Sequence, residues 1–286
     1  MAEETKNTLD ENITPSEDTA VNENITPSED SKIEENITLY EKLLKKQEAS
    51  PEKEAICIDK EYFAYTDAVS EVDILAAAFE ECNVTAGTLI TLCMPDNAQK
   101  LFCVYALNKI GAIAYLAEPG MKAEELSDLM KKTGSECLVM MDSMLPDYRE
   151  MLTEMDPGMV VVCSKADYFS FAKRKIRRIV AKEAATDCPK DAFYTTYKQM
   201  RRFGKEILTG KLDDTYDWPS AFEEVAPEPE KEEFVPKVKP EDTAVVFSVK
   251  DKDGKEEEVT VSSNDEARLP EFLQTLIRKE QVDDVK

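Results

Sequence analysis

The sequence predicts an α/β domain with a mainly parallel sheet and flanking helices, and three observations carry this prediction. Apolar segments of strand length alternate with segments of helical periodicity from Pro51 to about Ser164. Helix-stopping glycines follow two of the helical segments, at Gly111 and Gly134. Several strand segments are continuously apolar, which is typical of strands buried on both faces of a sheet. Such alternation is produced by βαβ units.

The elements are expected in a fixed order along this region. Two short strands, AICID and YFAYT, come first, and a helix over AVSEVDILAAAFEECN follows them. Each later strand precedes a helix, in the pairs 88–95 with 97–111, 112–119 with 122–134 and 136–142 with 146–155. The strand MVVVCS at 159–164 ends the alternation. The predicted α/β domain therefore spans residues 38–164.

Residues 1–37 are predicted to be a disordered acidic arm. The octapeptide ENITPSED occurs at 11–18 and again at 23–30, and ENITLYEK follows from Glu35. Met1 to Thr38 contains eleven acidic residues and two lysines, so it cannot bury enough apolar surface to fold alone. The first helix is expected at Thr38, because Thr38-x-x-Glu41 matches a capping box and an apolar stripe follows.

The second half of the chain divides into three predicted segments. Residues 165–222 form a basic helical insertion, since 165–211 carries thirteen Lys or Arg against five acids and includes the amphipathic FAKRKIRRIVAKEA. That helix either packs on its own body or contacts a membrane surface or an acidic partner. Residues 223–242 contain four prolines and eight acidic residues, a composition that predicts an extended linker. Residues 243–286 are expected to form a hairpin and a C-terminal helix.

Composition excludes several classes of function. The formal net charge of −24 opposes nucleic-acid binding. The chain has no histidine, which excludes histidine bases and ligands. Its seven cysteines lack a C-x-x-C pair, so reduced core thiols in a cytoplasmic protein are favoured over disulfides or a zinc site. There is neither an apolar run long enough to span a membrane nor a secretory signal.

The pairs Asp142 with Asp147 and Asp213 with Asp214 are interpreted as solvated loop acids, and Trp218 as a packing anchor.

The region from LYEKLLKKQEAS to CLVMMD resembles the adenylate-forming, AMP-dependent acyl-CoA synthetases and ligases. The resemblance rests on the order and spacing of nine residues: Gly87, Pro95, Asn97, Ala106, Gly111, Ala112, Pro119, Glu124 and Leu126. It implies that this chain contains part of the large ligase domain. It also implies ATP, magnesium and coenzyme A as the family's cofactors.

The family's phosphate loop corresponds to the stretch FSVKDKDGKEEEV, but here its chemistry is degenerate. Ser248, Gly254 and Lys255 are the residues that match the family's ATP phosphate loop. From Lys250 to Glu258 there are three lysines and five acids, and two like charges about 4 Å apart repel by about 4 kcal/mol at an effective dielectric near 20. The expected loop is vestigial and does not bind ATP. Asp253-Gly254 between alternating strands also predicts a simple hairpin turn.

These observations favour a truncated, catalytically inactive ligase-like protein. The sequence ends at Lys286, before the family's adenine, ribose and metal contacts and its C-terminal domain, so no catalytic or metal-binding residue is assigned. Two alternatives stay open: a non-catalytic protein-interaction module and one half of a split acid–thiol ligase. No bound cofactor is expected. We also expect the uncovered sheet to be shielded by the insertion, or by a copy of the chain or another protein.

Overall fold

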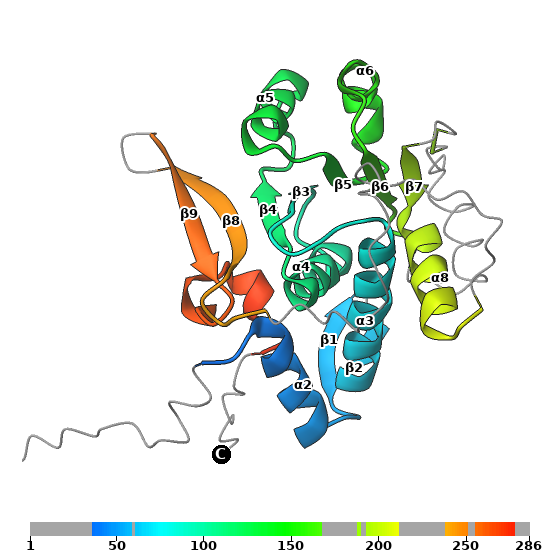
Figure 1. The fold of residues 1–286 in the computed structure, drawn as a ribbon, viewed down its shortest axis with the longest axis vertical. Coiled ribbons are helices and arrows are strands. Elements are labelled where there is room, and N and C mark those ends of the chain that lie inside the picture. The colour runs from blue at the N-terminus through cyan, green and yellow to red at the C-terminus, as the bar shows by residue number, and fades with distance from the viewer. Residues whose placement is uncertain are drawn as a thin grey trace, which may run out of the picture.

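A seven-stranded sheet organises the computed structural model of the chain, with the strand order β7-β6-β5-β3-β4-β8-β9 (Figure 1). Every pairing in this sheet is parallel except β8 with β9. The structure describes residues 36–58, 61–167, 188–189, 193–211, 238–250 and 255–277. The predicted α/β class with a mainly parallel sheet is therefore confirmed.

The strands of this sheet are β3 (Leu89–Cys93), β4 (Ile113–Ala117), β5 (Cys137–Met141), β6 (Met159–Cys163), β7 (Tyr194–Thr196), β8 (Thr243–Lys250) and β9 (Glu256–Ser262). The helices are α2 (Leu39–Ala49), α3 (Tyr65–Glu81), α4 (Ala98–Ile110), α5 (Ala123–Thr133), α6 (Leu145–Met155) and α8 (Tyr197–Leu208). The two short strands predicted first are β1 (Glu54–Ile58) and β2 (Glu61–Ala64), which form a separate antiparallel pair.

Helices cover both faces of the sheet because alternate strand residues point to opposite sides. In β5, Val139 belongs to the core shared with α2, α3, α4 and α8, whereas Leu138 belongs to the core under α5 and α6. All five residues of β5 and all five of β6 are buried. Figure 1 shows α5 and α6 together on one side and α3, α4 and α8 on the other.

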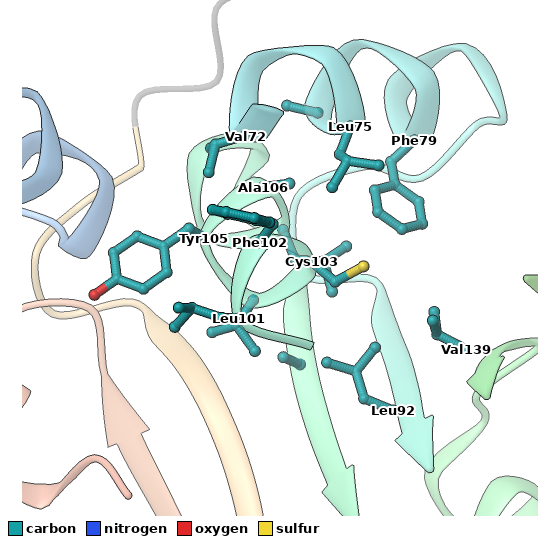
Figure 2. Close-up of a cluster of buried hydrophobic side chains, with 14 of the residues drawn as sticks. Val72, Leu75, Phe79, Leu92, Leu101, Phe102, Cys103, Tyr105, Ala106 and Val139 are labelled. Atoms are coloured by element: carbon teal, nitrogen blue, oxygen red, sulfur yellow. The ribbon is translucent and has the colours of Figure 1, made fainter. Parts of the chain in front are cut away.

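Helix α4 forms the centre of the larger core (Figure 2). Asn97 caps its N-terminus by accepting a hydrogen bond from the Lys100 amide, and Gly111 ends it with φ +76°, a left-handed conformation that glycine tolerates. Leu101 and Phe102 are completely buried between the sheet and α3. Each such side chain contributes about 1.5–3 kcal/mol through burial.

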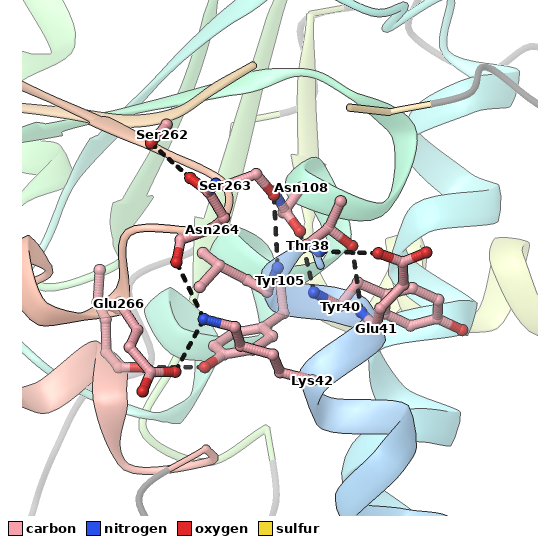
Figure 3. Close-up of polar contacts among 12 residues, drawn as sticks. Thr38, Tyr40, Glu41, Lys42, Tyr105, Asn108, Ser262, Ser263, Asn264 and Glu266 are labelled. Carbon is pink, nitrogen blue, oxygen red and sulfur yellow. Dashed lines mark hydrogen bonds and ion pairs between the residues drawn. The ribbon is translucent and has the colours of Figure 1, made fainter. Parts of the chain in front are cut away.

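A polar network ties the N-terminal helix to the C-terminal segment (Figure 3). Thr38 and Glu41 form the predicted capping box at the start of α2. Asn108 of α4 accepts a hydrogen bond from the Tyr40 amide at 3.0 Å and donates to the Ser263 hydroxyl at 2.6 Å. These bonds fix the base of the β8–β9 hairpin against two helices, since Ser263 follows β9 directly.

Two expectations about the second half of the chain are wrong. The alternation was expected to stop after Ser164, but β7 pairs in parallel with β6 and α8 follows it. In place of a C-terminal helix, the described residues form two 3₁₀ turns, Glu266–Arg268 and Glu271–Gln274. Pro270 lies between the turns, where it removes an amide donor and prevents a continuous helix.

Several sequence predictions lie outside the described residues. These are the arm at 1–35, the helix over FAKRKIRRIVAKEA, Trp218, the pair Asp213 and Asp214, and most of the linker. None of the helices within the described part of the chain is both long and apolar enough to span a membrane.

Candidate functional site

The predicted phosphate loop is the tip of the β8–β9 hairpin. Ser248 lies in β8, opposite Glu258 of β9. Lys255 precedes β9, and Gly254 falls in 251–254, outside the described residues. The antiparallel pairing continues to Lys250 opposite Glu256. The expected strand–loop–strand arrangement is therefore present.

The backbone pairing of the hairpin leaves few groups for a phosphate. A phosphate cradle needs successive unpaired amide groups that point to one place. Here β8 and β9 are in register from Phe247 opposite Val259 to Lys250 opposite Glu256, and the preceding part of β8 also pairs with β4. The ladder thus confines any free loop to the few residues between Lys250 and Glu256.

The charges at the hairpin oppose a polyphosphate. Glu256, Glu257 and Glu258 are all exposed. The Lys250 ammonium lies 3.6 Å from a Glu118 carboxylate oxygen and 3.7 Å from one of Glu256. These ion pairs are well exposed, so each contributes at most about 1 kcal/mol to stability. They still place carboxylates around the cation that would otherwise face a phosphate.

The hydroxyl of Ser248 already has a partner within the sheet. It lies 3.2 Å from the hydroxyl of Tyr115, a residue of β4 whose side chain is buried. This hydrogen bond links β4 and β8 on the sheet face that carries α5 and α6. Ser248 therefore has a structural role in this arrangement.

Other reactive groups do not form a catalytic cluster. All seven cysteines are free, and five of them are buried. Burial raises the pKa of Cys82 to about 12 and that of Cys93 to about 11, so both stay protonated and unreactive at neutral pH. Among the described residues, no group of three or more Cys, Asp or Glu side chains could hold a metal ion.

A cleft that the sequence did not predict lies at the carboxyl ends of the parallel strands. Its volume is about 510 Å³, and its walls come from the segments after β3, β4, β5 and β6. The chain passes from β3 to β4 on one side and returns to β5 on the other side of β3. Ligands of open α/β sheets bind at such reversals of strand order. No motif in the sequence identified the cleft, because its lining comes from four separate segments of the chain.

Asp142 directly follows β5, and Asp147 belongs to the next helix, α6. The Asp142 amide donates a hydrogen bond to the Cys163 carbonyl, so this residue joins the ends of β5 and β6. Asp147 lies in the first turn of α6 and borders the cleft. The interpretation of both as loop or helix-end acids stays a prediction.

Comparisons with known proteins identify the family. The model of the AMP-binding enzyme family matches residues 43–247, which is most of the chain. A comparison of the sequence with curated proteins gives no significant match. The family match ends at Phe247, immediately before Ser248 of the predicted phosphate loop.

Solved structures agree with this assignment in fold. The anthranilate CoA ligase AuaEII in complex with anthranoyl-AMP is similar with a TM-score of 0.54 and 13% identity, over 80% of this chain and 35% of that chain. Coronafacic acid ligase from Pectobacterium brasiliense is similar with a TM-score of 0.53 and 12% identity, over 79% and 35%. The chain thus spans about a third of the length of these ligases. The family match and the shared fold show that this chain belongs to the family of AMP-binding enzymes.

Proposed function

We propose that this protein is a non-catalytic member of the AMP-binding enzyme family, which does not bind ATP at its phosphate loop. The observation that carries the proposal is the hairpin itself: paired backbone up to Lys250 and Glu256, with three consecutive glutamates on β9. ATP and magnesium do not fit a loop of this charge and pairing. No reaction step is therefore assigned to the chain.

Two other functions are less well supported. One half of a split ligase would need a working phosphate site, and the acidic hairpin argues against it. A protein-interaction module is compatible with the hairpin, because β9 forms one edge of the sheet. The unpaired state of all seven cysteines supports a cytoplasmic location for either function.

Calorimetric titration with ATP and magnesium tests the proposal. We expect no binding at millimolar ATP and no release of pyrophosphate with fatty or aryl acids and coenzyme A. A full-length anthranilate CoA ligase serves as the positive control for both assays. Pyrophosphate release that depends on the added acid would overturn the proposal.

A charge-neutral variant separates the effect of charge from that of backbone pairing. In this variant Glu256, Glu257 and Glu258 are all replaced by glutamine. If it binds ATP whereas the natural chain does not, charge alone blocks the site. If neither binds, the paired backbone is sufficient to prevent binding.

A further inference from the structure

The outer side of β9 is a free sheet edge within the described part of the chain. β9 is the last strand of the sheet, and β8 is its one partner among the described residues (Figure 1). In an antiparallel pair, alternate residues direct their amide and carbonyl groups away from the partner strand. Along the seven residues of Glu256–Ser262 these outward groups form a row about 23 Å long, at about 3.4 Å per residue. Such a row is a template for one more strand.

The C-terminal half of this edge is held in place by the body of the protein. Val261 is completely buried, and Val259 packs against the same core. Directly after β9, the Ser263 hydroxyl accepts a hydrogen bond from the Asn108 side chain at 2.6 Å, and the Asn264 carbonyl accepts one from the Lys42 ammonium at 3.0 Å. An edge that is fixed before binding loses little conformational freedom when a strand is added to it. The β9 edge is therefore preorganised for a partner strand.

Carboxylates lie on both faces of this edge. Alternate residues of a strand point to opposite faces, so Glu257 shares the face of Val259 and the larger core. Glu256 and Glu258 lie on the other face, where a Glu258 carboxylate oxygen is 3.9 Å from the Lys132 ammonium of α5. An added strand also directs its side chains to both faces. It would therefore meet a carboxylate on each face.

The cations of the hairpin compensate these carboxylates incompletely. The Lys250 ammonium is shared between Glu256 and Glu118, at 3.7 Å and 3.6 Å. Glu257 has no ion-pair partner among the described residues. The whole chain carries a formal net charge of −24, which adds to the negative potential at this edge. A strand that pairs here gains most if it is cationic.

Charge also determines which strands the edge rejects. A second copy of β9 would bring three further glutamates to the same place, and like charges that lie close together repel. A neutral strand gains the backbone hydrogen bonds but no charge pairs. A strand with Lys or Arg opposite Glu256, Glu257 and Glu258 gains both. The edge thus selects by charge among strands that have the same backbone.

We propose that the β9 edge binds an extended, lysine- and arginine-rich segment of a partner protein by strand addition. Basic side chains of the partner contact Glu256, Glu257 and Glu258, while its backbone pairs with the outward groups of β9. Residues with high strand propensity lie opposite Val259 to Val261. The proposal adds a partner to the non-catalytic role and does not rest on it, because ATP binding and peptide binding are measured separately. Either can fail while the other stands.

The synthetic hexapeptide VTVKRK tests the pairing. In antiparallel register its basic triplet lies opposite Glu258 to Glu256, and its VTV segment lies opposite Val261 to Val259. The control peptide VTVEEE keeps the length and reverses the charge. In NMR titrations of the full chain, VTVKRK should bind with a dissociation constant on the order of 0.1 mM at low salt and more weakly at high salt, and VTVEEE should not bind. Equal affinity of the two peptides, or no binding of either up to a few millimolar, would overturn the proposal.

Two N-methylated forms of VTVKRK separate strand addition from simple charge attraction. In each form, methyl groups on alternate amides block one edge of the peptide and leave every side chain unchanged. The form whose free edge faces β9 should bind as the parent peptide does, and the other form should not. Bound peptide should also slow hydrogen exchange of the outward amides of β9. Equal affinities of the two forms, or unchanged exchange in β9, would rule out backbone pairing.

A charge reversal on the protein tests the assigned contact. Glu257→Lys should weaken binding of VTVKRK about tenfold, because one attractive pair becomes repulsive. Glu150→Lys on α6 makes the same change in net charge and should alter the affinity by less than about twofold. Both glutamates are exposed, so both variants should fold. Equal weakening by the two variants would show long-range electrostatics alone and contradict the contact with Glu257.

Two other occupants of the edge give different results in the same experiments. If VTVKRK dissociates a dimer of the chain that is seen by sedimentation velocity, a second copy occupies the edge. If the peptide binds only after the segment FAKRKIRRIVAKEA has been deleted, this basic segment of the chain itself occupies the edge. Either result would overturn the assignment to a partner protein. Binding of the peptide to the monomeric full chain supports that assignment.

Discussion

The two edges of the sheet have different neighbours. At the β7 edge, α8 packs against α3 and buries Tyr197, Met200 and Phe203. Gly204 allows this close approach, because a Cβ atom there would lie 1.8 Å from the Ile74 carbonyl oxygen. At the β9 edge there is no such helix among the described residues, and the hairpin extends from the body in Figure 1. Exposed glutamates occupy this edge instead.

This difference contrasts apolar packing beside one edge with exposed charge on the other. An unpaired strand edge invites association with another strand, and proteins prevent it by covering the edge or by placing charges on it. Beside β7, α8 buries its apolar side against α3 on one face of the sheet. At β9 the same glutamates that oppose phosphate binding also oppose pairing with another copy. An acidic edge strand is thus compatible with this fold.

Phe203→Ala should give the largest effect, in the helix beside β7. Phe203 is 2% exposed at the α3–α8 contact, so its truncation should lower the free energy of unfolding by about 3–5 kcal/mol. Leu208→Ala in the same helix is the control, since Leu208 is 55% exposed and should change stability by less than about 0.5 kcal/mol. Urea unfolding measures both. Similar values for the two variants would show that α8 does not contribute its buried face to the core.

Gly204→Ala should destabilise the same edge by about 1–3 kcal/mol through the clash with Ile74. The sign of the change in unfolding free energy is diagnostic. Without the clash, alanine in a helix would be about 1 kcal/mol more favourable than glycine, and the variant would be more stable. Lys205→Ala, on the exposed side of α8, should have almost no effect. A more stable Gly204→Ala protein would mean that the two helices are not in close contact.

Asp167→Asn should have a smaller, pH-dependent effect near the end of β6. Burial raises the pKa of Asp167 to about 6, above the value of about 3.9 in unfolded chains. The folded protein therefore binds this proton more tightly, and stability falls as the pH rises from about 4 to about 6. At pH 7.5 the variant should be more stable than the natural chain by on the order of 1 kcal/mol, and this difference should shrink toward pH 4. Thermal unfolding of both proteins between pH 4 and pH 7.5 measures this difference in stability. A variant that is less stable than the natural chain at both pH values would contradict the raised pKa of Asp167.

Neutralising the β9 glutamates should leave stability almost unchanged but promote association. With Glu256, Glu257 and Glu258 replaced by glutamine, the exposed strand loses the charges that keep copies apart. Sedimentation velocity at increasing protein concentration should show dimers or larger species. The control neutralises three exposed glutamates on α5 and α6, namely Glu124, Glu150 and Glu154. Association of both variants would implicate net charge in general and not the edge.

Much of the central fold was predictable because its signals are local. The continuously apolar strands, the helical periodicity and the Gly111 stop each have a direct physical meaning in the sequence, and the structure confirms the elements they predict. Strand β7 was missed because Tyr194–Thr196 is only three residues long and follows a basic segment. The C-terminal helix was predicted wrongly because the prediction followed the resemblance to the helix after the family's phosphate loop, whereas Pro270 prevents a continuous helix here.

The sequence by itself determined the α/β class, the family and the acidic chemistry of the hairpin, because these depend on residue type and order along the chain. Only the tertiary structure decided the sheet order, the packing of α8 against α3 and the position of the cleft. Each of these depends on contacts between distant residues, such as Ile74 with Gly204 and Tyr148 with Met121. Such contacts form where packed elements meet, and local periodicity does not specify which elements those are.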